Sequence, residues 1–183
     1  MNYHKIEKTS VANGPGVRVV LWVSGCSLHC KGCHNPQTWD FNSGKPFDKA
    51  AKQELFNALN KSYIQGITFS GGHPLEPENT EETLCLIKEI KEKFPDKDIW
   101  LYTGYTLEDI CERYCNQAIY HLYSNIAEPN IWSNIQYVDV IVDGSYIEEQ
   151  RDITLPFRGS KNQRLIDVKE TIKQGQIIQY KIN

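Results

Sequence analysis

Four short apolar runs divide this chain, and a glycine-bearing polar loop follows each of them. The runs cover residues 17–23, 67–69, 99–102 and 138–142. Uninterrupted runs of this length, rich in β-branched and aromatic residues, are typical of strands that are buried on both faces of a sheet. We therefore predict four buried strands.

Segments with helical periodicity fall between the predicted strands. Asp48 stands where it can cap a helix, because apolar residues follow it at helical spacing. Asn79 with Glu82, and Thr106 with Asp109, have the spacing of a capping box at the start of two further helices. This alternation predicts an α/β fold with a mainly parallel sheet and flanking helices.

The loops after the four runs read, in chain order, SGCSLHC, SGGHP, TGY and DGS. In open parallel sheets, ligands bind in the crevice outside the carboxyl ends of the strands. We therefore expect these four loops to meet there and to form the functional site.

Composition sets broad limits on the chain. Its 183 residues are 40% hydrophobic and 23% charged, as in ordinary globular proteins, so we expect a single domain over 1–183. The formal net charge of −3 gives no overall attraction to nucleic acid or to an anionic membrane, and neither is expected as a partner.

No apolar run approaches the roughly 20 residues that span a bilayer, and the N-terminus lacks the apolar core of a signal peptide. We expect a cytoplasmic location.

Three of the six cysteines, Cys26, Cys30 and Cys33, fall within eight positions as CxxxCxxC. In a reducing compartment they are better explained as metal ligands, catalytic thiols or buried apolar residues than as disulfides. A structural zinc ion would need His34 as its fourth ligand, but adjacent residues seldom both reach one tetrahedral ion. A redox dithiol of Cys30 and Cys33 leaves Cys26 unexplained. Unrelated core thiols fit poorly, because the segment is polar and contains glycine.

An iron–sulfur cluster accounts better for the number three. A four-iron, four-sulfur (4Fe-4S) cluster usually takes four thiolates, so three thiolates leave one iron open to bind another molecule. An open coordination position is what separates a metal centre that does chemistry from a closed structural one. The zinc and dithiol alternatives remain open on these residues alone.

CxxxCxxC just after a first strand resembles the signature of radical S-adenosylmethionine enzymes. The resemblance implies a compact partial (βα)6 barrel. It also implies that the open iron binds the amino and carboxylate groups of S-adenosylmethionine, and that the reduced cluster donates an electron to the sulfonium. Methionine then leaves and a 5′-deoxyadenosyl radical forms.

Further blocks of the chain narrow this resemblance. NGPGVRVVLWVSGC looks like the lead-in of glycyl-radical-enzyme activases, and CKGCHNPQTW is similar to activating proteins of anaerobic ribonucleoside-triphosphate reductase. Gly32 precedes the third cysteine, where many radical S-adenosylmethionine enzymes have an aromatic residue. ITFSGGHPL, WLYTGYT, VDVIVDGSY and LPFRGSKNQRLIDV resemble later blocks of the same family, in the same order.

The resemblance implies that the radical removes hydrogen from a glycine backbone carbon of the reductase. The sequence does not identify the electron donor, and we expect a flavodoxin or ferredoxin-type protein. Two alternatives stay open. One is a radical enzyme that acts on a small molecule or on another glycyl-radical enzyme. The other is a zinc-binding interaction module without enzymatic activity.

The pair Gly71 and Gly72 explains a tight turn after the second run, and it also lets backbone approach a ligand closely. By resemblance, this block binds the amino group of S-adenosylmethionine, usually with an acid after the glycines. Here His73 takes that place. A neutral imidazole accepts one hydrogen bond and brings no negative charge. We expect His73 to lie beside the ligand without being essential.

Three more residues are candidates for contact with S-adenosylmethionine. His34 lies either near the adenine, as the resemblance implies, or in a turn that Asn35 and Pro36 favour. Thr103 ends the third run and Asp143 follows the fourth, so each fits either a pocket or a structural role.

The remaining cysteines and a basic stretch receive simpler interpretations. Cys85, Cys111 and Cys115 are expected to pack in the core as small apolar residues rather than to bind a second cluster. Arg158, Lys161 and Arg164 are expected to lie on a solvated loop, with a docking surface for the partner as the alternative.

Overall fold

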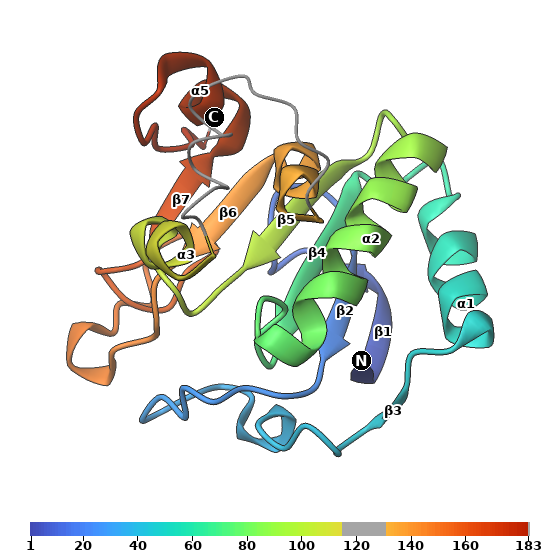
Figure 1. Ribbon diagram of the computed structural model, residues 1–183, viewed down its shortest axis with the longest axis horizontal. Coiled ribbons are helices and arrows are strands. Elements are labelled where there is room, and N and C mark those ends of the chain that lie inside the picture. The colour runs from blue at the N-terminus through green and yellow to red at the C-terminus, as the bar shows by residue number, and fades with distance from the viewer. Residues whose placement is uncertain (115–130, 183) are drawn as a thin grey trace.

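The computed structural model describes residues 1–114 and 131–182, and the described strands form one seven-stranded sheet (Figure 1). The strands are β1 (Asn2–Ser10), β2 (Arg18–Val23), β3 (Lys45–Pro46), β4 (Gly66–Gly71), β5 (Asp98–Tyr102), β6 (Val140–Asp143) and β7 (Arg164–Asp167). The described helices are α1 (Lys49–Leu59), α2 (Pro77–Lys93), α3 (Leu107–Tyr114) and α5 (Val168–Gln174). Short 3-10 helices are η1 (Pro36–Thr38), η2 (Ile131–Tyr137) and η3 (Glu148–Gln150).

The strand order across the sheet is β3-β1-β2-β4-β5-β6-β7. The central strands β2, β4, β5 and β6 pair in parallel, whereas β1, β3 and β7 pair antiparallel with their neighbours. The four predicted strands are these parallel ones, so the predicted α/β class with a parallel centre is confirmed. The antiparallel strands were not predicted, because strands near a sheet edge remain partly solvated and lack a continuous apolar run.

The two faces of the sheet have different coverings. Side chains alternate along a strand, and Val19, Leu21 and Val23 of β2 all belong to the main hydrophobic core. Residues of α1 and α2 complete that core, and Figure 1 shows both helices on the same side of the sheet. A second, smaller core lies around Trp100, with Phe157 and Tyr180 packed edge-on against its ring.

Two of the three predicted helix starts are confirmed. The Asp48 carboxylate accepts from the Ala51 amide at 2.9 Å and caps α1. Thr106 and Asp109 form a reciprocal capping box before α3. The Thr106 amide donates to Asp109 Oδ2 at 2.9 Å, and the Asp109 amide donates to Thr106 Oγ1 at 3.1 Å.

The capping box predicted for Asn79 and Glu82 is wrong. Helix α2 already begins at Pro77, because proline is well suited to the first turn, where its missing N–H is not needed. Asn79 therefore lies inside the helix and is buried. Its amide donates to the carbonyl oxygens of Ser24 and His73, at 2.8 and 3.1 Å, and so holds two loops of the sheet edge together.

The cap of α1 allows a direct test. We expect Asp48→Ala to lower the free energy of unfolding by about 1 kcal/mol, because the Ala51 amide loses its acceptor. Urea denaturation followed by circular dichroism measures the change. Asp48→Asn should retain most of the stability, and equal losses in both variants would contradict the capping role.

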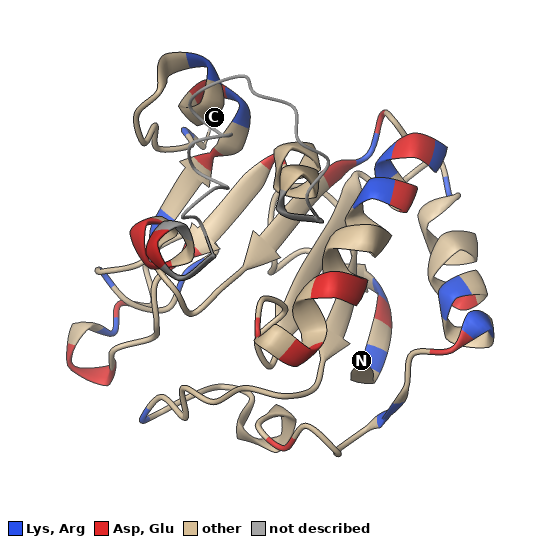
Figure 2. Cartoon of the chain, in the orientation of Figure 1, with Lys and Arg blue, Asp and Glu red and all other residues tan. Residues whose placement is uncertain are grey.

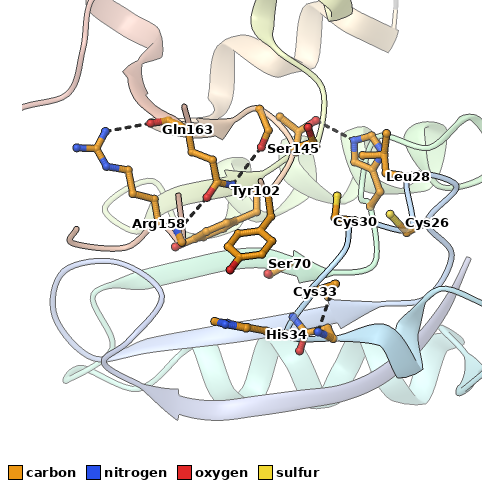
Figure 3. Close-up of a pocket in the computed structure, with 18 of the residues that line it drawn as sticks. Cys26, Leu28, Cys30, Cys33, His34, Ser70, Tyr102, Ser145, Arg158 and Gln163 are labelled. Atoms are coloured by element: carbon orange, nitrogen blue, oxygen red, sulfur yellow. Dashed lines mark hydrogen bonds between the residues drawn. The ribbon is translucent and has the colours of Figure 1, made fainter. Parts of the chain in front are cut away.

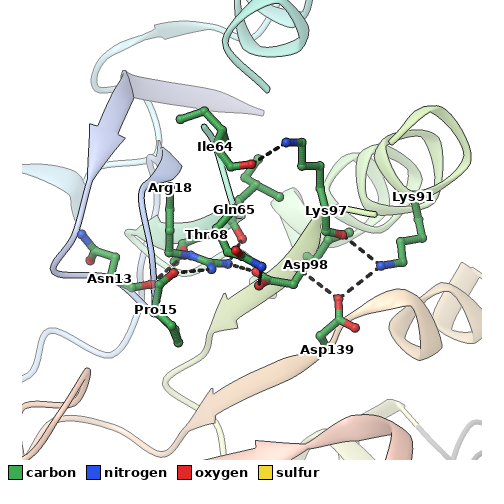
Figure 4. Close-up of polar contacts among 12 residues, drawn as sticks. Asn13, Pro15, Arg18, Ile64, Gln65, Thr68, Lys91, Lys97, Asp98 and Asp139 are labelled. Carbon is green, nitrogen blue, oxygen red and sulfur yellow. Dashed lines mark hydrogen bonds and ion pairs between the residues drawn. The ribbon is translucent and has the colours of Figure 1, made fainter. Parts of the chain in front are cut away.

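A buried arginine links three of the parallel strands at the end of the sheet where they begin (Figure 4). Arg18 is fully buried, and its guanidinium donates to Thr68 Oγ1 at 2.9 Å and to the Ile67 carbonyl at 3.0 Å. It also pairs with Asp98 and lies over the Trp100 ring, 5.4 Å from its centroid. Buried charges persist only when they are paired and hydrogen-bonded, and Arg18 meets both conditions.

One expectation for the other cysteines fails. Cys85 lies on α2 but is exposed, because its position faces away from the core that Leu84 and Ile87 join. The Cys111 side chain and all of Cys115 lie outside the described residues, so the expectation for them stays a prediction.

Charged side chains of both signs are interspersed on the outer helices, while the central strands carry few (Figure 2). No helix in the described part of the chain has the length and apolar character that crossing a membrane requires.

Candidate functional site

The loops that follow β2, β4, β5 and β6 surround a cavity of about 490 Å³. All three cysteines of the CxxxCxxC motif line it. Figure 3 shows them on one side of the cavity, with Arg158 and Gln163 on the other. The cavity therefore lies at the carboxyl ends of the parallel strands, where the loop pattern predicted a site.

The cysteine loop is held by backbone contacts with the segment around η1. The Gly25 amide donates to the Thr38 carbonyl at 2.8 Å, and the Cys26 amide donates to the Trp39 carbonyl at 3.0 Å. His29, between the first two cysteines, has a left-handed φ of 45°, which residues other than glycine seldom adopt. Strained backbone of this kind gathers at functional sites.

The three thiols differ in their burial and in their backbone neighbours. The Asn35 amide donates to Cys33 Sγ at 3.4 Å. Burial raises the pKa of Cys26, while hydrogen bonds from the Leu28 and His29 amides act in the opposite direction. Burial likewise raises the pKa of Cys30, against a hydrogen bond from the Tyr146 amide. Hydrogen bonds to cluster sulfurs are among the features that set the reduction potential of an iron–sulfur centre.

The geometry of the thiols bears on what they could hold. Among residues 1–114 and 131–182, no three His, Cys, Asp or Glu side chains converge closely enough to hold one metal ion. His34 is exposed and lines the cavity, with its ring 5.9 Å from that of Tyr146. Thiolates of an iron–sulfur cluster bind separate irons and need not converge on one point. Three thiols around one cavity fit such a cluster.

The glycine pair allows the loop after β4 to pack against the cysteine loop. A side-chain carbon at Gly71, whose φ is 105°, would lie 2.7 Å from the Val23 carbonyl oxygen. At Gly72 it would lie 2.5 Å from the Gly25 carbonyl oxygen. Both glycines line the cavity, so they provide a turn and also a close approach of backbone to the site.

His73 also lines the cavity, but its side chain is only 1% exposed. Nδ1 lies 3.2 Å from Glu76 Oε1, and Nε2 lies 2.8 Å from Thr103 Oγ1. The imidazole packs edge-on against Tyr105, with centroids 4.3 Å apart. Both ring nitrogens are therefore occupied by protein partners, and Thr103 joins His73 at the cavity wall.

Two predicted site residues lie outside the cavity lining. Asp143 is fully buried, accepts from the Leu107 amide at 2.8 Å and from Arg164 Nε at 3.0 Å, and so holds the start of α3. Gly32 is exposed, with a φ of 75°, and faces the Glu148 side chain.

The basic stretch is not the solvated loop that the sequence suggested. Arg164 belongs to β7, and pairing with Asp143 and then with Glu108 raises its pKa. Arg158 donates to the Gln163 carbonyl at 3.1 Å and lines the cavity. Of these three residues, Lys161 alone is mostly exposed, and its Nζ lies 3.8 Å from Asp152 Oδ2.

Sequence reasoning missed the residues that close the cavity opposite the cysteines. They belong to the segment 146–163, which follows the predicted DGS loop and folds back over the end of the sheet, and to β5. The Tyr102 hydroxyl donates to the Phe157 carbonyl at 2.6 Å, and burial raises the pKa of Tyr102. The alternation along β5 puts Tyr102 on the same face as Trp100, which was the available signal.

Gly32 supports a second prediction. We expect Gly32→Ala to lower the free energy of unfolding by about 1–2 kcal/mol, because a left-handed backbone is unfavourable for residues with a side chain. The new carbon would also lie 2.0 Å from Glu148 Oε2 and displace that side chain. Chemical denaturation of the single variant and of Gly32→Ala with Glu148→Ala separates the two causes. A double variant with the wild-type free energy of unfolding would show that the left-handed backbone contributes nothing to the loss.

Comparison with known proteins defines the class first. Residues 12–166 match the family model described as a 4Fe-4S single cluster domain. This match spans most of the described sheet and all of the cysteine loop. The chain thus belongs to the class of 4Fe-4S single cluster domains.

The particular family follows from the curated relatives. The chain is 40% identical over 165 residues to the anaerobic ribonucleoside-triphosphate reductase-activating protein of Escherichia coli K12, covering 89% of this chain and 96% of that protein. It is 44% identical to the protein of the same name from Enterobacteria phage T4, covering 90% and 93%. The Haemophilus influenzae protein of that name is 41% identical, covering 89% and 96%. The chain belongs to the family of anaerobic ribonucleoside-triphosphate reductase-activating proteins.

Proposed function

We propose that this chain activates anaerobic ribonucleoside-triphosphate reductase by generating a glycyl radical on it. The observation that carries the proposal is the cavity into which three cysteines project without a fourth ligand of the same kind among the described residues. Relatives that cover most of the chain are named for activation of this reductase. Four parallel strands with helices on one face support the partial barrel of radical S-adenosylmethionine enzymes, formed by residues 1–183 as one domain.

When bound, the reduced 4Fe-4S cluster supplies one electron that breaks a carbon–sulfur bond of S-adenosylmethionine, giving methionine and a 5′-deoxyadenosyl radical that takes one hydrogen atom from the glycine. The electron comes from a flavodoxin or ferredoxin-type donor. The proposed ligands of the cluster are Cys26, Cys30 and Cys33. Such a site needs a compartment in which thiols stay reduced, which is the basis for proposing a cytoplasmic location.

The protein's own residues bind and orient. A cavity of about 490 Å³ falls in the range of small-molecule sites, roughly 300–1,000 Å³. We assign the S-adenosylmethionine contacts to lining residues of the cysteine loop and of the loops after β4 and β5: His34, Gly71, Gly72, His73 and Thr103. Gly32 and Asp143 act on this site by shaping the surrounding loops.

A carbon radical attacks almost any nearby C–H bond, so the reacting atoms must be held together and other molecules kept out. Leu28, Trp39, Tyr102 and Phe157 give the cavity apolar walls. The glycine that reacts must enter this cavity from the reductase. Association with the reductase is therefore a step of the reaction and also completes the closure of the site.

Anaerobic reconstitution with iron and sulfide, followed by addition of the reductase, S-adenosylmethionine and a reductant, tests the proposal. We expect a glycyl-radical signal in electron paramagnetic resonance and one methionine per radical formed. Cleavage that needs a small molecule and not the reductase would favour the small-molecule alternative. About one zinc per chain with no bound iron would favour the interaction module, and a loaded cluster that yields neither radical nor methionine would refute the proposal.

A further inference from the structure

Glu76 is a buried carboxylate between the cysteine loop and the glycine loop. It is 2% exposed and does not line the cavity. Its Oε1 accepts from the Ser27 amide at 2.8 Å and from the Ser27 hydroxyl at 2.7 Å. The same oxygen lies 3.2 Å from His73 Nδ1. Ser27 directly follows Cys26, so Glu76 contacts the interior of the CxxxCxxC segment.

The contacts of Glu76 continue to a third loop. An ionised carboxylate only accepts hydrogen bonds, so Nδ1 of His73 carries the hydrogen that faces Glu76. In the neutral ring Nε2 is then an acceptor, and the Thr103 hydroxyl donates to it at 2.8 Å. Thr103 Oγ1 in turn accepts from the Tyr105 amide at 3.2 Å. The chain of bonds joins the loops after β2, β4 and β5.

Glu76 does not serve as an ordinary helix cap. It occupies the N-cap position of α2, but its side chain makes no capping hydrogen bond. Burial by itself raises its pKa, yet the hydrogen bonds from His73 and Ser27 outweigh burial and bring the pKa to about 2. Asn79 also links the two loops, because its side-chain amide donates to the carbonyl oxygens of Ser24 and His73. Glu76 differs from Asn79 because it accepts hydrogen bonds from Ser27 itself.

We infer that Glu76 is a positioning residue that fixes Ser27, and with it Cys26, relative to His73 and Thr103 in the walls of the site. This rests on the proposed function in one respect, that these walls hold the cluster and S-adenosylmethionine. It also accounts for His73, which stands where an acid was expected. The carboxylate is present three residues later, behind the imidazole, and bonds to it.

Hydrogen exchange of the metal-free protein tests the inference without relying on activity. We expect Glu76→Ala to speed amide exchange in residues 24–30 by about 10- to 100-fold, the range for loss of charge-assisted hydrogen bonds. Ser27→Ala removes only the hydroxyl donor and should give a smaller increase, which keeps the test usable if Glu76→Ala folds poorly. Glu78→Gln is the matched control, because Glu78 is exposed on the same helix. Unchanged exchange in both Glu76→Ala and Ser27→Ala would overturn the inference.

The loaded enzyme gives a second, separable readout. We expect Glu76→Gln and His73→Gln each to raise the KM for S-adenosylmethionine by about tenfold while iron content stays near wild type, and their effects to be non-additive because the two residues share one network. Additive effects, or an unchanged KM, would contradict the coupling. If the wild-type protein cleaves no S-adenosylmethionine, the proposed function fails, and the exchange measurement still decides the role of Glu76.

Discussion

Cys30→Ala is expected to abolish both cluster assembly and glycyl-radical formation. Cys30 lines the cavity between the other two thiols of the motif, and its removal leaves two thiolates for a cluster that usually takes four. Iron should fall from about four atoms per chain to well below one after anaerobic reconstitution, with loss of the brown absorbance. The glycyl-radical signal should disappear with it.

Cys85→Ala provides the matched control for this loss. Cys85 is also a free thiol, but it is exposed on α2 and takes no part in the cavity lining. We expect its variant to retain iron and radical formation at the wild-type level. Equal iron content in Cys30→Ala and wild type would remove Cys30 from the ligand set and would reopen the redox-dithiol and zinc interpretations.

Arg18→Ala is expected to produce the largest loss of stability, about 3–5 kcal/mol in the free energy of unfolding. The variant leaves the partly buried Asp98 without its ion-pair partner, and it removes donors from Thr68 and from the Ile67 carbonyl in the sheet. Breaking a buried ion pair by removing one member is costly, because the remaining polar groups keep the cost of burial without compensation. Urea denaturation of the metal-free protein measures the change.

A surface ion pair gives the contrast for Arg18. Lys8 pairs with Glu54 at 2.9 Å, but its side chain is 62% exposed, so we expect Lys8→Ala to cost less than about 1 kcal/mol. Arg18→Met combined with Asp98→Asn should be more stable than Arg18→Ala, because it removes both charges. An Arg18→Ala protein as stable as Lys8→Ala would show that the network of Figure 4 contributes little.

Arg18 acts at the end of the strands opposite the cysteine loop. It stands at the first residue of β2, and Asp98 at the first residue of β5, whereas the cavity is built beyond the last residues of these strands. Arg18 variants should therefore alter stability without changing the ligands of the cluster. Iron bound per folded chain, measured below the unfolding transition, should stay near the wild-type level.

Local patterns in the sequence were sufficient for the parallel centre of the fold. Each of the four apolar runs became a parallel strand, since continuous apolar character directly reflects burial on both faces. Asp48 and Thr106 cap helices as predicted, because capping depends on residues only three positions apart. The CxxxCxxC spacing likewise carried the prediction of a cluster, and the family match supports that cluster.

Long-range partners decided the rest. On the sequence alone, Asp143 fitted either the ligand pocket or a structural role, and Arg164 and the Leu107 amide draw its carboxylate away from the cavity. Segment 146–163 closes the site only because the antiparallel return of β7 brings it back over the sheet.

Glu76 shows the physical reason most clearly. No motif in the sequence singled out Glu76, because its chemical role depends on Ser27, 49 residues earlier in the chain. Periodicity and spacing report on neighbours within a turn or a strand. Which buried polar groups satisfy one another depends on how the loops meet at the sheet edge, and the tertiary structure alone contains that information.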